Sequence, residues 1–194
     1  RTKRLFPGCR VVSIEPVHEN RLLHELTLRE LSPDRNWELI DGVLNYFPEN
    51  TKFFNHKYYS TTGRLVPKNG LSKYTERYRE YEGFSAKSFT LKELIYLAGG
   101  RVDILKMDCE GGENGLIFNE NGEYVVHPDI ELMKDIPIIT GEWHGHEVPK
   151  PKGHYCNSQF TNTLIDALGT THNVISYDPC EGDGIGGFFC WKSV

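Results

Sequence analysis

Short apolar runs alternate with amphipathic segments along most of this chain, and that alternation constrains the fold more than any other feature. The predicted strands cover residues 10–16, 37–44, 102–107 and 136–142. The predicted helices cover residues 19–31, 91–98, 128–134 and 160–168. This order is typical of an α/β protein with a mostly parallel sheet and helices on both faces. Two last runs, 174–177 and 188–191, predict a terminal antiparallel pair.

Composition limits the class of protein further. The chain has 194 residues, 38% of them hydrophobic and 25% charged, which is typical of one globular domain. Its net charge of −5 argues against a globally cationic nucleic-acid binder. We see neither a signal peptide nor an apolar run of the roughly 18 residues that a membrane span needs. Five cysteines without a CxxC pair favour a reducing compartment, such as the cytoplasm, over a disulfide framework.

Acidic residues stand at the ends of the predicted strands. Glu15, Asp108 and Glu142 each come at the carboxyl end of a strand, and Asp41 lies near the end of another. In open α/β sheets, ligands bind beyond the carboxyl ends of the strands. We therefore expect these acids to line one site.

Two of these strand ends carry motifs that resemble the FkbM-type methyltransferase family. They are Val12-Ser13-Ile14-Glu15-Pro16 and Ile104-Leu105-Lys106-Met107-Asp108-Cys109-Glu110-Gly111-Gly112-Glu113. The family pattern is an I-E-P strand end followed later by L-K-x-D-x-E-G-x-E, and the segment 88–94 resembles the family's helix start. The resemblance implies a class I, S-adenosylmethionine-dependent methyltransferase fold with a C-terminal antiparallel hairpin. It also implies methylation of hydroxyl oxygens on small molecules or sugars.

The resemblance assigns the cofactor to three of the acids. Glu15 is expected to accept hydrogen bonds from the two ribose hydroxyls, as an acid at such a strand end does in dinucleotide-type sites. Asp41 is expected to meet the adenine amino group, or alternatively to form a turn before Gly42. Asp108 is expected beside the transferring methyl group, where it contacts the cofactor and orients the acceptor hydroxyl or takes its proton.

The acceptor side is expected to involve Glu110, Glu113 and Glu142. Glu110 and Glu113 have an alternative structural role at the start of the following helix. His144 keeps the E-x-H pattern of the family, and its imidazole suits a general base; the alternative is an ordinary polar surface residue.

Two other side chains of this segment have competing interpretations. Glu142, His144 and His146 would share one face of an extended strand, which is a weak metal signal, and we expect no bound metal. Cys109 stands between acids, which disfavour a thiolate, so we expect a packed cysteine rather than a nucleophile.

The sequence departs from the family pattern at its beginning. The family has a first strand and a D-x-G-x-x-x-G turn ahead of the I-E-P strand, whereas only nine residues precede Arg10. We therefore expect a sheet that lacks its first strand. The alternative function is a non-catalytic, methyltransferase-like binding module that associates with a missing N-terminal segment or a partner chain. Residues 184–187 are expected to form a hairpin turn rather than a replacement for the glycine turn.

Residues 51–87 form a basic, aromatic insertion within a single domain spanning residues 1–194. They hold eight aromatic residues, and eight Lys or Arg against three Glu. Tyr74, Tyr78 and Tyr81 would share one face of a short helix. Such a segment suits a lid that recognises the acceptor, or a plain surface subdomain. An RNA methyltransferase that uses this basic segment is a weaker alternative.

Overall fold

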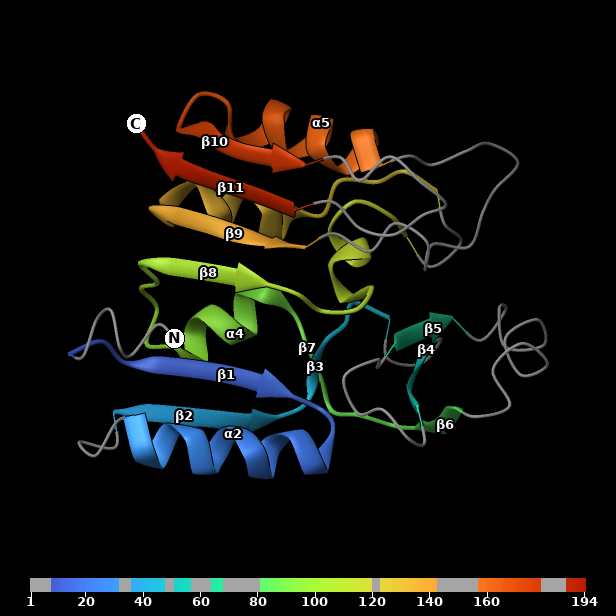
Figure 1. Ribbon diagram of the computed structural model, residues 1–194. Helices are drawn as coiled ribbons and strands as arrows, with labels where there is room; N and C mark the ends of the chain where they lie inside the picture. The colour runs from blue at the N-terminus through green and yellow to red at the C-terminus, as the bar shows by residue number, and fades with distance from the viewer. Residues whose placement is uncertain are drawn as a thin grey trace.

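The computed structural model describes residues 8–31, 36–47, 51–56, 64–67, 81–119, 123–142, 157–178 and 188–194. The strands before the central helix are β1 (Val11–Glu15), β2 (Trp37–Asp41), β3 (Val43–Leu44), β4 (Thr51–His56), β5 (Arg64–Pro67), β6 (Tyr81–Phe84) and β7 (Ser88–Phe89). The later strands are β8 (Ile104–Met107), β9 (Ile138–Glu142), β10 (His172–Asp178) and β11 (Phe188–Ser193). The α-helices are α2 (His18–Leu31), α4 (Leu91–Leu97) and α5 (Asn157–Leu168), and the 3-10 helices are η2 (Gly112–Leu116) and η3 (Pro128–Asp135) (Figure 1).

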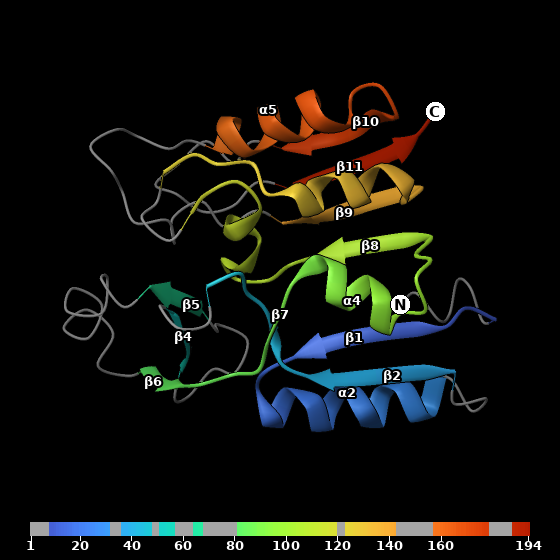
Figure 2. The same cartoon turned by 180° about the vertical axis from the view of Figure 1, so that it is seen from behind.

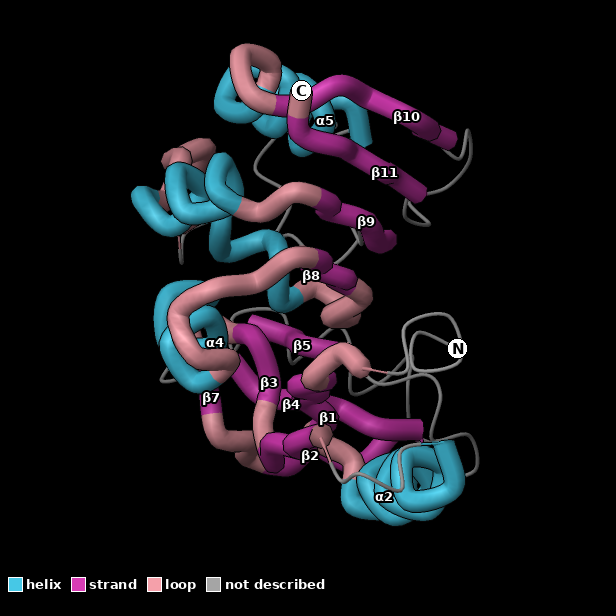
Figure 3. Tube along the Cα trace, turned by 90° about the vertical axis from the view of Figure 1, so that its left-hand side faces the viewer, coloured by secondary structure: helices cyan, strands magenta, loops and turns pink. Residues whose placement is uncertain are grey.

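Helices cover both faces of the strands, as an α/β protein requires. Figure 3 shows α4 and α5 on one face and α2 on the other. β1 and β2 are parallel, and β8 and β9 are parallel. The arrows of β1, β2 and β8 point the same way in both Figure 1 and Figure 2. β11 runs antiparallel to β9 and to β10, which confirms the predicted terminal antiparallel pair.

A single, mostly parallel sheet was the expectation, and the described residues do not form one. β2 and β1 form one sheet, whereas β10, β11, β9 and β8 form another in that order. β1 and β8 each have a hydrogen-bonded neighbour on one side only among the described strands. The physical reason is that no described strand lies between β1 and β8 to join their backbone ladders.

The predicted strand 37–44 is two strands, because the chain changes partners at Gly42. β2 pairs with β1, whereas β3 pairs with β7. A Cβ atom at Gly42 would lie 2.5 Å from the carbonyl oxygen of Lys87 and 2.6 Å from the ring of Phe89. Glycine therefore permits the crossing between the two sheets.

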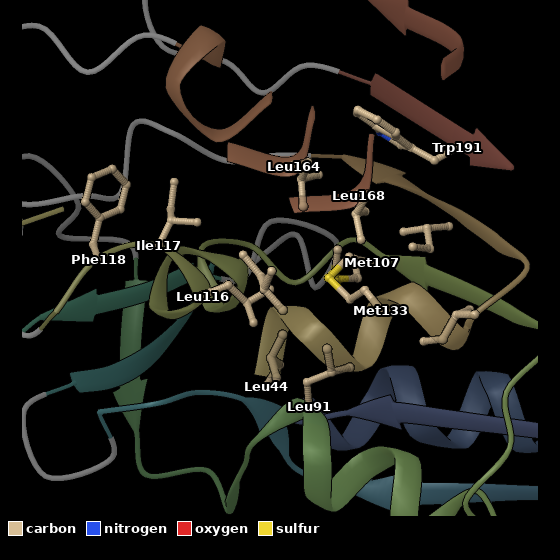
Figure 4. Packing of buried hydrophobic residues seen from close by; sticks show 13 residues of the cluster. Leu44, Leu91, Met107, Leu116, Ile117, Phe118, Met133, Leu164, Leu168 and Trp191 are labelled. Carbon is tan, nitrogen blue, oxygen red and sulfur yellow. The ribbon is translucent and has the colours of Figure 1, made fainter. Parts of the chain in front are cut away.

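The main hydrophobic core lies between the four-stranded sheet and the helices α4, η3 and α5. Figure 4 shows side chains from each of these elements meeting there. Members of this cluster that are at most 2% exposed include Leu91, Met107, Leu116, Met133, Leu164, Leu168 and Trp191. Full burial of one such side chain stabilises the fold by about 1.5–3 kcal/mol, so this cluster dominates the apolar stabilisation.

Helix α2 forms as predicted, but three of its leucines face solvent. Leu22, Leu23 and Leu26 are 48%, 62% and 59% exposed. Arg21 and Leu28, seven residues apart and therefore on one helix face, are partly buried instead. The helix is turned so that its polar Arg21 reaches the strand ends.

Helix α4 has well-defined ends. Thr90 and Glu93 form a capping box, in which the backbone N–H of Glu93 donates to Thr90 Oγ1 at 3.2 Å and the N–H of Thr90 donates to Glu93 Oε2 at 2.8 Å. The hydrogen bonds from Thr90 lower the pKa of Glu93. Gly99 and Gly100, both with positive φ, close the carboxyl end as predicted.

The inserted segment contributes three antiparallel strands, in the order β5-β4-β6. They lie beyond the carboxyl ends of β1 and β8 in Figure 1. The predicted tyrosine helix does not include Tyr81, which begins β6, and Tyr74 and Tyr78 lie outside the described residues, as does the predicted turn at 184–187. Among the described residues, no helix has both the length and the apolar character to cross a bilayer.

Candidate functional site

The four predicted acids lie at the carboxyl ends of parallel strands. Glu15 and Asp41 are the last residues of β1 and β2, Glu142 is the last residue of β9, and Asp108 directly follows β8. Because the two strand pairs point the same way, these ends share one side of the molecule (Figure 1). This is the side on which α/β proteins bind ligands.

Glu15 and Asp41 stand directly opposite each other in the register of β1 and β2. Paired residues of neighbouring strands direct their side chains to the same face of a sheet. Glu15 Oε1 accepts a hydrogen bond from the backbone N–H of Val17 at 2.9 Å, which fixes the carboxylate at the turn into α2. The structure therefore places these two acids side by side at the ends of β1 and β2.

Arg21 joins the two strand ends. From the first turn of α2, its Nη1 atom donates to the carbonyl oxygens of Glu15 at 3.2 Å and Pro16 at 3.0 Å. The same Nη1 atom forms an ion pair with Asp41 Oδ1 at 2.5 Å. Neither sequence motif contains Arg21; the signal available in the sequence was a basic residue in a Leu-rich helix that follows an acidic strand end.

Asp108 leaves β8 with its carboxylate already oriented. Lys106 lies two residues earlier, on the same face of the strand, and its Nζ atom is 2.7 Å from Asp108 Oδ2. The Asp108 side chain is 40% exposed. The position at the strand end and the partial exposure both suit contact with a bound molecule.

The backbone after Asp108 makes a tight left-handed turn. Glu110 and Gly111 have φ values of 49° and 100°, and Gly112 N–H donates to the carbonyl of Cys109 at 3.0 Å. The turn leads into η2, where Glu113 is 0% exposed. Burial favours the structural alternative for Glu113 over direct acceptor contact, whereas Glu110 is only partly buried.

Cys109 packs against the hydrophobic core rather than presenting a thiolate. Burial raises the pKa of its thiol well above the usual range, and the nearby Glu113 and Asp108 raise it further. The thiol therefore stays protonated at neutral pH and is a poor nucleophile. The sequence predicted this from the acids alone, whereas burial is the larger cause.

The remaining predicted residues are only partly covered by the structure. Glu142 is partly buried and pairs with Phe188 in the register of β9 and β11. His144 and His146 lie outside the described residues, so their predicted roles stay predictions. Among the described side chains, no three His, Cys, Asp or Glu residues gather into a metal-binding group.

This geometry is that of an α/β protein with four acids at the carboxyl ends of its parallel strands, the side on which such proteins bind ligands. The family model of the methyltransferase FkbM domain matches residues 1–155. The chain therefore belongs to the FkbM methyltransferase domain family, which confirms the resemblance carried by the two motifs. Neither the curated proteins nor the solved structures with which we compared the chain include a match.

Proposed function

We propose that this chain is an S-adenosylmethionine-dependent methyltransferase that acts on a hydroxyl oxygen of a small molecule or sugar. The observation that carries the proposal is the FkbM match over residues 1–155, on a chain whose Glu15 and Asp41 end the paired strands β1 and β2 and whose Asp108 directly follows β8. The proposal includes a class I methyltransferase arrangement. Its support is the strand order β10-β11-β9-β8, with parallel β8 and β9 and antiparallel β11, together with the parallel pair of β1 and β2.

The acids present at the strand ends fit the chemistry of this cofactor. Its ribose hydroxyls and adenine amino group are hydrogen-bond donors, and carboxylates are acceptors. Glu15 uses Oε1 for the Val17 N–H, so Oε2 would face the ribose hydroxyls. Asp41 uses Oδ1 for Arg21, so Oδ2 would face the adenine amino group. The negative charge of the acids also complements a cofactor that carries a sulfonium and an ammonium group.

Asp108 is placed to handle the acceptor. When bound, the cofactor supplies an electrophilic methyl group on a cationic sulfur. Asp108, held by Lys106, would orient the acceptor hydroxyl and take its proton as the methyl carbon exchanges its bond to sulfur for a bond to the acceptor oxygen, which leaves the sulfur as a neutral thioether. His144 is the alternative base. Glu110 and Glu142 border the acceptor, and the inserted strands β4 to β6 form a lid beyond the strand ends.

The first test is calorimetric titration of the 194-residue chain with S-adenosylhomocysteine, the product that competes for the donor site. We expect saturable binding of one equivalent. Absence of binding would contradict the proposal for this chain.

Asp108→Ala tests the chemical role. We expect transfer of labelled methyl groups to a panel of sugars and hydroxylated small molecules to fall by about 100-fold or more, since general base and orienting groups contribute that much. Asp103→Ala is the matched control, because Asp103 is an exposed acid paired with Arg101 just before β8. Full activity of Asp108→Ala would remove the proposed role.

A second candidate function is a methyltransferase-like binding module. The observation that favours it is the unpaired edge that both β1 and β8 present among the described strands. Such edges template pairing with another segment or chain. A partner-dependent shift in gel filtration without binding of S-adenosylhomocysteine would favour this function, and a stable monomer would count against it.

A further inference from the structure

Arg21 is anchored to the protein backbone rather than free at the surface. Its side chain is only 19% exposed, although it lies on a helix whose neighbouring leucines face solvent. Two main-chain carbonyls, those of Glu15 and Pro16, accept hydrogen bonds from it at 3.2 and 3.0 Å. The Nη2 atom lies 3.5 Å from His18 Nδ1. A guanidinium held in this way has a fixed position at the end of β1.

Asp41 has the opposite character. Its side chain is 67% exposed, so without a partner its carboxylate would sample several rotamers. The ion pair with Arg21 holds Oδ1 and thereby sets the orientation of the whole carboxylate. The second oxygen, Oδ2, remains to accept a hydrogen bond at the carboxyl edge of the sheet.

We propose that Arg21 is a specificity-determining positioning residue, which fixes Asp41 so that the donor site accepts a base with an exocyclic amino group. The inference rests on the proposed function, because it assigns the Asp41 carboxylate to the base of the cofactor. It adds a residue that the two sequence motifs do not contain.

The selectivity follows from hydrogen-bond chemistry. An ionised carboxylate only accepts hydrogen bonds, and the amino group of adenine donates them. Hypoxanthine carries a carbonyl oxygen at that position, so two acceptors would face each other. A fixed carboxylate cannot turn away from this repulsion, whereas a freely rotating one can, and selectivity therefore depends on Arg21.

Removal of the Arg21 guanidinium should affect the Asp41 carboxylate more than the Glu15 carboxylate. Glu15 and Asp41 are directly opposite each other, but Arg21 binds Glu15 through its main-chain carbonyl and Asp41 through its side chain. The Glu15 carboxylate is held separately by the N–H of Val17. Loss of the guanidinium should therefore disturb recognition of the base more than recognition of the ribose.

The test compares two probes, S-adenosylhomocysteine and its deaminated counterpart S-inosylhomocysteine, titrated calorimetrically into the full chain. We expect the wild type to bind the adenine probe about tenfold or more tightly, as sites built around one hydrogen bond discriminate at least this much. In Arg21→Gln the preference should shrink to about threefold or less, because the carboxylate is no longer fixed.

Two further variants sharpen the result. Arg29→Gln is the matched control, because Arg29 lies on the same helix but pairs with Glu25, away from the strand ends; its preference should equal that of the wild type. Asp41→Asn replaces one acceptor oxygen by a donor and should favour the hypoxanthine probe relative to wild type. Circular dichroism checks the fold of each variant, and Arg21→Met, which keeps an apolar stem but removes the charge, replaces Arg21→Gln if the latter does not fold.

The outcomes separate the two proposals. A folded Arg21 variant with the wild-type preference would overturn the role of Arg21 and leave the methyltransferase proposal standing. A wild type that binds both probes equally would also overturn the role of Arg21 and leave the methyltransferase proposal standing. A wild type that binds neither probe would overturn the donor site itself, and the role of Arg21 with it.

Discussion

The two ends of the strand array are stabilised by different physical means. The sheet of β8 to β11 packs on α4, η3 and α5 through an extensive cluster of buried side chains. Within the described parts of the chain, the unit formed by β1, α2 and β2 has beside it only a small apolar cluster of Val17 and Val43 with Ala86, and all five residues of β1 are half-buried. Polar contacts of Arg10 with Ala98 and Glu38, and of Arg21 with Asp41, join the elements of this region.

This difference divides the proposed site. The acids assigned to the cofactor, Glu15 and Asp41, lie on the unit held by polar contacts. Glu142, assigned to the acceptor, and Asp108, assigned to both the acceptor and the methyl end of the cofactor, lie at the strand ends of the sheet held by apolar packing. Regions with fewer buried apolar contacts open at lower free energy, so we expect the cofactor side to be the more adaptable of the two.

Gly141→Ala should lower the free energy of unfolding most, because it adds a methyl group inside the well-packed sheet. Gly141 lies opposite Met107 in the register of β8 and β9, and a Cβ there would lie only 1.8 Å from the carbonyl oxygen of Met107. The strands would have to separate, so we expect a loss of about 3 kcal/mol or more in the free energy of unfolding. Urea denaturation followed by circular dichroism measures it.

Gly8→Ala is the matched control for this change, because an added Cβ at Gly8 has no atom within 4 Å. We expect its stability to match the wild type within about 0.5 kcal/mol. Equal stability of Gly141→Ala and the wild type would show that the β8–β9 contact is less rigid than the structure indicates.

The same Leu→Ala truncation in each region tests the difference in apolar packing directly. Leu164 in α5 is 1% exposed, whereas Leu23 in α2 is 62% exposed. Leu164→Ala should cost about 2–5 kcal/mol through lost burial and a cavity, whereas Leu23→Ala should change stability by less than about 0.5 kcal/mol. Thermal and urea unfolding of both variants would show which truncation lowers the free energy of unfolding more. A large cost at Leu23 would mean that α2 buries its leucines in solution.

Local sequence signals predicted the elements well and the side-chain placement less well. Apolar runs bounded by Gly and Pro identified β1, β8, β9, α4 and α5 to within a few residues, because these signals act between near neighbours. Periodicity also identified α2, but the rotation of that helix depends on Arg21 reaching carbonyls outside it. Such a contact is tertiary, and no pattern within the helix specifies it.

The candidate site shows the same limit. The strand-end positions of Glu15, Asp41, Asp108 and Glu142 follow from the motifs and from parallel topology. The full burial of Glu113 does not, because it depends on how the turn after Asp108 folds onto the core. The division of the strands into separate sheets also escaped prediction in detail, since the change of partners at Gly42 depends on the distant residues Lys87 and Phe89.

Arg10→Gln should have a small effect on the free energy of unfolding, confined to one region of the molecule. Arg10 donates to the carbonyl of Ala98, which caps α4, at 2.9 Å and pairs with Glu38 on β2 at 2.9 Å. Both partners of this ion pair are nearly half exposed, so we expect a loss of only about 1 kcal/mol. Amide exchange in β1 and β2 should accelerate about fivefold, while β9 and β11 stay unchanged. Arg101→Gln, which breaks an almost fully exposed pair with Asp103, should alter neither region. Uniform acceleration across all four strands would contradict the proposed difference in local stability between the two regions, because the two regions would then open as one unit.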